Sequence, residues 1–125
     1  MKSGKSVCLM AAAVLGAGSI PVPAEASFYS GEELLKVCTA QRGSAAYVEN
    51  TYECIAYITG SVDAFNTYRR TISMKSCIPE DVTIAQLRRV TVAYLQDNPG
   101  KREEAGSALV FAATRQAWPC AKKAR

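Results

Sequence analysis

The sequence YSGEEL at residues 29–34 carries every part of a helix start. Ser30 can accept a hydrogen bond from the backbone N–H of Glu33, and the Glu33 side chain can reach back to the N–H of Ser30. Apolar residues follow at helical spacing, and the next residue that favours a helix end is Gly43. This capping box predicts a helix that begins after Ser30 and ends near residues 41–43.

A second capping box occurs in VTIAQL at residues 82–87. Thr83 occupies the N-cap position, and the side chain of Gln86, three residues later, can accept a hydrogen bond from the backbone N–H of Thr83. The predicted helix runs to about Asp97. One face of this helix is formed by Leu87, Val90, Thr91, Tyr94 and Leu95. Because the complete motif occurs twice, an accidental match is a poor explanation.

A longer helix is predicted between these two, from about residue 47 to residue 70. Its apolar residues recur at helical intervals and do not alternate as in a strand. They are Val48, Ile55, Ile58, Val62 and Phe65. A second stripe consists of Ala56, Gly60 and Ala64. Small side chains at this spacing would let another backbone approach closely; the alternative is that Gly60 is merely tolerated, at a cost of about 1 kcal/mol relative to alanine.

The last predicted helix begins at Asn98 as its cap, with Pro99 in the first helical position, where the missing N–H costs nothing. It ends at Trp118-Pro119. Between these points it continues through Ala105, Ala108, Leu109, Ala112, Ala113 and Ala117. No segment after residue 26 has the pattern of a strand. The predicted fold class is therefore all-α, a small bundle of four main helices.

Residues 1–26 have the three-part layout of a secretory signal. Two lysines precede an apolar run over residues 7–20, and Ala24-Glu25-Ala26 then forms a small-x-small cleavage site. The run is too short and too rich in glycine and alanine to cross about 30 Å of hydrocarbon, which disfavours a membrane anchor. We expect cleavage after Ala26 and release of residues 27–125 into the periplasm as one helical domain.

Four cysteines remain in residues 27–125, namely Cys38, Cys54, Cys77 and Cys120. They allow three pairings. Cys38 and Cys54 lie at similar distances from the first interhelical loop, while Cys77 precedes the third helix and Cys120 follows the fourth. Antiparallel helix pairs would therefore favour the disulfides Cys38–Cys54 and Cys77–Cys120. The alternative is a four-thiolate zinc site, but such sites normally contain Cys-x-x-Cys pairs, which are absent here.

The composition argues against several kinds of function. The chain has no histidine, which removes the commonest general base and the commonest metal ligand. Its glutamates fall in helix starts and surface patterns, and its basic residues are scattered, without the dense stripe of a nucleic-acid-binding protein. We therefore expect no enzymatic activity, no catalytic residues, no metal or other cofactor, no nucleic-acid partner, and no membrane partner after signal cleavage.

The ordered motifs around the four cysteines resemble those of the Rap/Tai immunity proteins. These are small periplasmic antitoxins that neutralise peptidoglycan amidases delivered by type VI secretion. The resemblance covers nearly all of residues 27–125. Its segments are SGEELL from Ser30 with Cys38, CIAYITGSVD from Cys54 to Asp63, Cys77-Ile78-Pro79, VTIAQL from Val82, Tyr94-Leu95 with Pro99, and Trp118-Pro119-Cys120.

The resemblance implies a helical, often dimeric protein that binds a cell-wall amidase effector and occludes its active site. A homodimer is accordingly among the expected assemblies. The resemblance assigns no contact residues, because its motifs mostly serve the scaffold. We expect Tyr57 and Gly60 to pack, and Asp63 either to be solvated or to pair with an arginine such as Arg70.

The segment at residues 71–76 is the first choice for the effector contact, because Cys77 and Pro79 restrain its end and lower the entropy lost on binding. Its candidate contact residues are Ile72, Ser73, Met74, Lys75 and Ser76. The loop at residues 42–46 is the second choice. The alternative for both segments is that they are plain connectors. For the whole protein, the alternatives are a periplasmic holdase or acid-stress chaperone and, third, an enzyme.

Overall fold

The computed structural model describes residues 27–121, so the predicted signal segment and its cleavage site lie outside the described residues. The chain forms four α-helices: α1 (Gly31–Cys38), α2 (Tyr47–Thr71), α3 (Ile84–Asp97) and α4 (Gly106–Ala117). A short 3₁₀ helix, η1 (Pro99–Lys101), precedes α4. Extended pairing within residues 27–121 is limited to an isolated bridge between Ser30 and Ala105. The prediction of an all-α fold with four main helices is confirmed.

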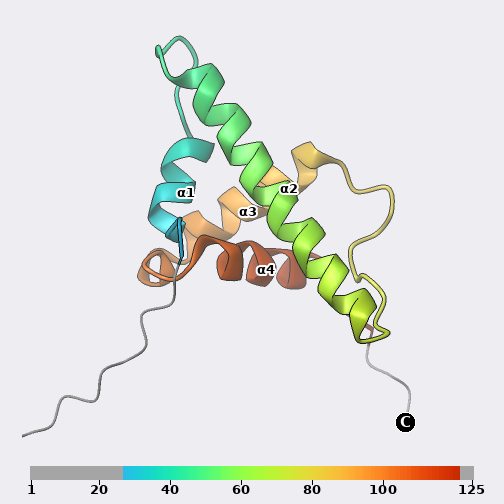
Figure 1. Ribbon diagram of the computed structural model, residues 1–125. Helices are drawn as coiled ribbons and strands as arrows, with labels where there is room; N and C mark the ends of the chain where they lie inside the picture. Colours follow the sequence, from blue (N-terminus) through green and yellow to red (C-terminus); the bar gives the residue numbers. More distant parts are fainter. Residues whose placement is uncertain (1–26, 122–125) are drawn as a thin grey trace, which may run out of the picture.

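The long helix α2 lies across the other three helices, and its first turns project beyond them (Figure 1). Every helix contributes apolar side chains to one shared core. The core consists of Leu34, Cys38, Cys54, Ile58, Val62, Leu87, Tyr94, Leu95, Leu109, Val110 and Ala113. The predicted inward face of α3 agrees with this core, since four of its five residues are buried and Val90 is half-buried.

Both predicted capping boxes are present, at Ser30 with Glu33 and at Thr83 with Gln86. The end of α1 differs from the prediction, because the helix stops at Cys38 and does not reach residues 41–43. Arg88 of α3 explains the early end. Its Nη2 donates a hydrogen bond of 2.6 Å to the carbonyl oxygen of Cys38, which would otherwise accept from the next helical turn.

The capping box of α1 should make the stability of the domain sensitive to acid. Hydrogen bonds from the backbone and hydroxyl of Ser30 lower the pKa of Glu33 from its ordinary value of 4.5. A lowered pKa in the folded state means that the ionised carboxylate stabilises the fold above that value and loses this effect as the pH falls through the folded-state pKa. We expect Glu33→Gln to lower the urea midpoint at neutral pH, and this difference from wild type to shrink as the pH falls through the lowered folded-state pKa of Glu33. A pH-independent difference would contradict the prediction.

A helix start with Asn98 as cap and Pro99 in the first position is present, but it opens only the short 3₁₀ helix η1; the prediction that the last α-helix starts there is wrong, because α4 begins at Gly106. The backbone before it turns toward α1. The carbonyl oxygens of Glu104 and Arg102 accept from the first N–H groups of α1, at 3.0 Å for Gly31 and 2.9 Å for Glu32. These N–H groups have no partner within their own helix. The segment that was expected to be helical is therefore used to complete the start of another helix.

The same junction also completes the C-terminal end of α3. Arg102 Nε donates to the carbonyl oxygen of Leu95 at 2.7 Å, and the Asn98 side chain donates to that of Tyr94 at 2.8 Å. The last carbonyl groups of a helix need such external donors. Residues 98–105 thus supply hydrogen-bond partners to the start of α1 and to the end of α3. These hydrogen bonds outweigh the local preference for an α-helix that begins at Pro99.

Gly60 does not provide the close packing that was expected of it. A Cβ atom added at Gly60 would meet no other atom within 4 Å, and the residue is exposed on α2. Close approach instead occurs at Gly31, where an added Cβ would lie 3.1 Å from the backbone of Arg102. The expected close packing at Gly60 is therefore not found within the described chain, where this glycine is merely tolerated.

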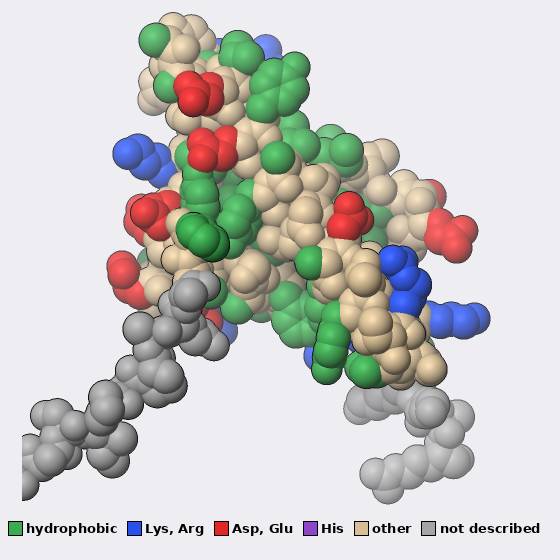
Figure 2. All heavy atoms as spheres, in the orientation of Figure 1, with side chains coloured by type: hydrophobic (Ala, Val, Ile, Leu, Met, Phe, Trp, Pro, Cys, Tyr) green, Lys and Arg blue, Asp and Glu red, His purple; other side chains and the backbone are tan. Residues whose placement is uncertain are grey.

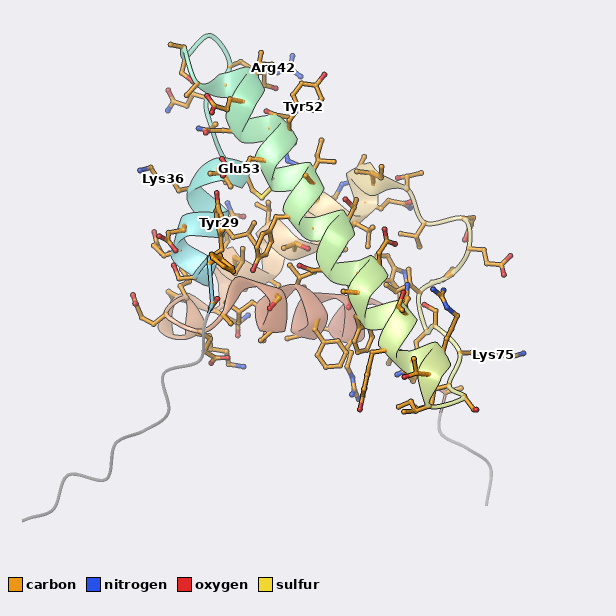
Figure 3. The ribbon with its side chains drawn as sticks, viewed as in Figure 1. Tyr29, Lys36, Arg42, Tyr52, Glu53 and Lys75 are labelled. Carbon is orange, nitrogen blue, oxygen red and sulfur yellow. A yellow bond between two sulfur atoms is a disulfide. The ribbon has the colours of Figure 1, made fainter. Side chains whose placement is uncertain are left out.

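The remaining residues of the central α2 motif behave as ordinary scaffold. Tyr57 is half-buried, and its ring centroid lies 5.0 Å from that of Tyr29, whose hydroxyl donates to Glu53 (Figure 3). Asp63 is exposed, and Arg70 donates to the Thr67 hydroxyl at 3.0 Å. The solvated alternative for Asp63 therefore applies.

The structure contains the two predicted disulfides, Cys38–Cys54 and Cys77–Cys120. In both pairs the Cα atoms are 5.0 Å apart, within the normal range for a disulfide. The first bond joins the end of α1 to α2 inside the core. The second joins the segment before α3 to the segment after α4.

Candidate partner-binding surface

The part of the chain that the structure describes has no cluster of three or more metal-binding side chains. None of the helices among residues 27–121 combines the length and the hydropathy that a membrane span requires. The candidate site described below is a surface that could contact another protein.

The two segments predicted to contact a partner lie at opposite ends of α2 (Figure 1). Residues 42–46 precede the helix, and residues 72–76 follow it. Because α2 has 25 residues and an α-helix rises 1.5 Å per residue, about 37 Å separates its ends. The structure does not combine the two segments into one surface. Thr71, which was predicted to lie in the second segment, is the last residue of α2.

The segment at residues 72–76 begins with a tightly defined helix end. The N–H of Met74 donates to the carbonyl oxygen of Arg69 at 2.8 Å, and the N–H of Ser73 donates to that of Arg70 at 3.0 Å. This is the hydrogen-bond pattern of a Schellman motif. Its left-handed position is occupied by Ser73, with φ of 57°, where glycine is the usual residue. The backbone at Ser73 therefore holds a conformation that a serine adopts only when its surroundings fix it.

Arg69 contacts the later part of this segment, at Lys75 and Cys77. Its side chain is buried, and its Nε donates to the carbonyl oxygen of Lys75 at 2.8 Å. Its Nη2 lies 3.2 Å from the sulfur of Cys77, and its guanidinium carbon lies 5.6 Å from the centre of the Phe65 ring. The Cys77–Cys120 disulfide fixes the segment one residue further on. Residues 72–76 are thus ordered before any partner binds.

Apolar side chains project from this ordered backbone. Ile72 is 48% exposed and Met74 is 45% exposed, while Tyr68, one helical turn before Ile72, is 61% exposed. Lys75 points away from the body of the protein (Figure 3). We call Tyr68, Ile72, Met74 and Lys75 the α2 C-terminal surface. Tyr68 was missed in the sequence, because the predicted helix ended near residue 70 and only the segment after it was considered for partner contact.

A hollow of about 910 Å³ adjoins the α2 C-terminal surface. It is lined by Arg69 and by residues 73–77 and 119–121. The sequence from residue 64 to residue 79 has three basic residues, Arg69, Arg70 and Lys75, and no acidic one. This end of the described chain is therefore positively charged and partly apolar.

The loop at residues 42–46 is exposed throughout and has weaker support. It contains Gly43 at φ of 87°, and its backbone is closed by a hydrogen bond of 3.2 Å from Ser44 to Gln41. Two exposed apolar side chains of α2, Val48 and Tyr52, lie near it. Hydrophobic side chains are thus exposed toward both ends of α2 (Figure 2).

A family model described as Rap1a immunity proteins matches residues 30–120. The matched range extends from the cap of α1 to the last cysteine of the second disulfide. Neither the curated proteins nor the solved structures give a match to the chain.

Proposed function

The chain belongs to the Rap1a immunity protein family, and from that premise we propose that it is a periplasmic antitoxin that binds a type VI secretion peptidoglycan amidase and occludes its active site. Immunity proteins of this kind protect against a type VI effector by binding it, so the chain is not an enzyme. The choice of an amidase as the effector, and occlusion of its catalytic cleft as the mechanism, are our proposals.

The two disulfides and the family membership indicate an extracytoplasmic protein. We assign it to the periplasm, with residues 1–26 as a cleaved signal peptide and residues 27–125 as the immunity domain. A peptidoglycan amidase acts in the same compartment, so toxin and antitoxin would meet there. Cys8 would leave with the signal and would take no part in the disulfides.

The observation that best supports a contact at the α2 C-terminal surface is its combination of order and exposure. Ile72 and Met74 expose apolar area while the Schellman motif, Arg69 and the Cys77–Cys120 disulfide already fix the backbone. A preordered segment loses little conformational entropy on binding. The basic residues around it favour a partner with an acidic rim, because complementary charge speeds association and fixes orientation.

A homodimer is the second assembly that we propose. The exposed face of α2 contains Ala56, Gly60 and Ala64, whose small side chains leave its backbone accessible. Light scattering after size exclusion would give the mass of the processed protein directly. A strictly monomeric protein at working concentration would remove this part of the proposal and leave effector binding untouched.

The test of effector binding uses the processed protein and candidate peptidoglycan amidases, beginning with any that is encoded next to its gene. We expect co-purification, inhibition of peptidoglycan cleavage, and at least about tenfold weaker binding for Ile72→Asp or Met74→Asp, since burying an unpaired charge at a contact costs more than 1.4 kcal/mol. Titration calorimetry gives both affinities. The matched control is Ile84→Asp, because Ile84 is 51% exposed and lies outside this surface.

The outcomes separate the proposals. If Ile72→Asp and Met74→Asp both bind with wild-type affinity while the parent protein inhibits the amidase, the contact does not lie at the α2 C-terminal surface. The loop at residues 42–46 would then be the next surface to test. Failure to bind or inhibit any amidase, together with suppression of client aggregation at low pH, would favour a periplasmic holdase.

A further inference from the structure

The two disulfides differ sharply in their exposure to solvent. Cys38 is 1% exposed and Cys54 is 0% exposed, so a reductant cannot reach the bond between them in the folded protein. Cys77 and Cys120 are each only half-buried. Both line the hollow of about 910 Å³ beside the α2 C-terminal surface, so a reagent can approach these two residues from that side.

The Cys77–Cys120 bond also has a cation beside one of its sulfurs. Arg69 Nη2 lies 3.2 Å from the Cys77 sulfur, and the Arg69 side chain is 8% exposed, so water screens its charge weakly. In thiol–disulfide exchange the sulfur that is better stabilised as a thiolate leaves faster. A guanidinium at this distance stabilises negative charge on the Cys77 sulfur.

We propose that Cys77–Cys120 is a site of thiol–disulfide exchange, selectively reducible by a dithiol while Cys38–Cys54 stays intact. A thiolate of the dithiol attacks the Cys120 sulfur, the Cys77–Cys120 bond breaks, and its electron pair leaves on the Cys77 sulfur beside Arg69. The second thiol of the reagent then attacks the mixed disulfide and releases Cys120. Overall, the dithiol is oxidised to a disulfide, and Cys77 and Cys120 gain two electrons and two protons.

Reduction would act on the proposed contact and not on the core. Neither Cys77 nor Cys120 belongs to the buried core, which draws its residues from all four helices. The bond instead fixes the end of residues 72–76 against residues 119–121. Its reduction therefore leaves the helices in place and frees one anchor of the α2 C-terminal surface. On the basis of the proposed function, the reduced form would bind its effector more weakly.

The first experiment needs no partner protein. The processed, oxidised protein is incubated with dithiothreitol without denaturant, free thiols are alkylated at intervals, and the modified peptides are identified by mass spectrometry. We expect Cys77 and Cys120 to be alkylated at least about 100-fold faster than Cys38 and Cys54, because access controls exchange, with unchanged far-UV circular dichroism. Reduction of both pairs at one rate, or selective reduction of Cys38–Cys54, would overturn the proposal.

The role of Arg69 is tested by Arg69→Met, which removes the charge and keeps a long side chain. We expect exchange about tenfold slower than in wild type and a largely restored rate in Arg69→Lys, since a cation favours the departing thiolate. The matched control is Arg70→Met, because this substitution removes the same charge from a side chain that donates its hydrogen bond to the hydroxyl of Thr67 and not to the disulfide. Equal rates in Arg69→Met and Arg70→Met would overturn the assigned role of Arg69, even if Arg69→Met also loosened residues 72–76.

The second experiment compares the oxidised and selectively reduced forms for binding to the inhibited amidase. We expect at least about tenfold weaker binding after reduction, because an ordered contact segment has become flexible. Equal affinity would overturn the link between the bond and the contact. If the oxidised protein binds no amidase, the proposed function fails, and the alkylation rates still decide whether the exchange site exists.

Discussion

Replacement of all four cysteines by alanine is expected to unfold the domain. Closure of the Cys38–Cys54 loop, with a separation of 16 residues, contributes about 3 kcal/mol, and closure of the Cys77–Cys120 loop, with a separation of 43 residues, contributes about 4 kcal/mol. The two loops do not overlap along the chain, so the losses should add. A domain of this size has about 5–15 kcal/mol of total stability, so a loss of about 7 kcal/mol equals the whole stability in the lower part of this range, where we expect a domain with so small a core to lie.

Far-UV circular dichroism and urea titration of the processed protein would check this result. The controls are the two double variants, C38A/C54A and C77A/C120A. Each should remain folded with a lower urea midpoint, because one cross-link still restricts the unfolded chain. A four-alanine variant that unfolds cooperatively, with a loss below about 2 kcal/mol, would show that the disulfides are not what stabilises this fold.

The second large effect is expected for Gly31→Ala. The added Cβ would lie 3.1 Å from both the Cα and the carbonyl oxygen of Arg102, and closer still to Leu109 Cδ1. Leu109 is 1% exposed, so its Cδ1 would have to shift among the packed side chains of the core. The backbone of Arg102 would also have to move away from α1, and overpacking of this kind costs about 1–3 kcal/mol.

Gly60→Ala is the matched control for this substitution. It adds the same methyl group to a helix, where it meets nothing within 4 Å. Because alanine favours a helix over glycine, Gly60→Ala should stabilise the domain by up to about 1 kcal/mol. Urea titrations of both variants give the two free energies of unfolding. Equal changes for the two variants would contradict the packing that we describe at Gly31.

The parts of the fold that the sequence predicted depend on local chemistry. A capping box is complete within four residues, so Ser30 with Glu33 and Thr83 with Gln86 could be recognised without knowledge of the tertiary structure. The helix map favoured the observed disulfide pairing, because Cys38 and Cys54 lie on neighbouring helices near the same loop, while Cys77 precedes α3 and Cys120 follows α4. Helix periodicity placed α2 within one residue of its observed end.

The errors occur where a distant segment supplies the hydrogen bonds. Pro99 has the local features of a helix start. The backbone carbonyl groups that follow it nevertheless accept hydrogen bonds from the first turn of α1, and the side chains of Asn98 and Arg102 donate to the last turn of α3. The early end of α1 depends in the same way on Arg88, which lies on another helix. The sequence could not show which of Gly31 and Gly60 is closely packed, because the neighbours of a glycine depend on the tertiary structure.

The candidate site was predicted in outline only. The restraint by Cys77 was visible in the sequence, and exposure of Ile72 and Met74 agrees with that reasoning. The choice between Arg69 and Arg70 was not visible, because two adjacent arginines look alike until the helix direction shows which one turns inward. Nothing in the sequence indicated that Ser73 would adopt a left-handed conformation, since serine rarely does so.

The pairing of α1 with the 98–105 junction also constrains the order in which the domain can be completed. The first turn of α1 takes its hydrogen-bond acceptors from Arg102 and Glu104, which lie near the other end of the chain. On the proposed export route the chain would cross the membrane from its N-terminal end, so α1 would emerge long before these acceptors. Its first N–H groups would then stay unpaired within the domain until residues 102–104 had followed, and the complete fold would form only late in translocation.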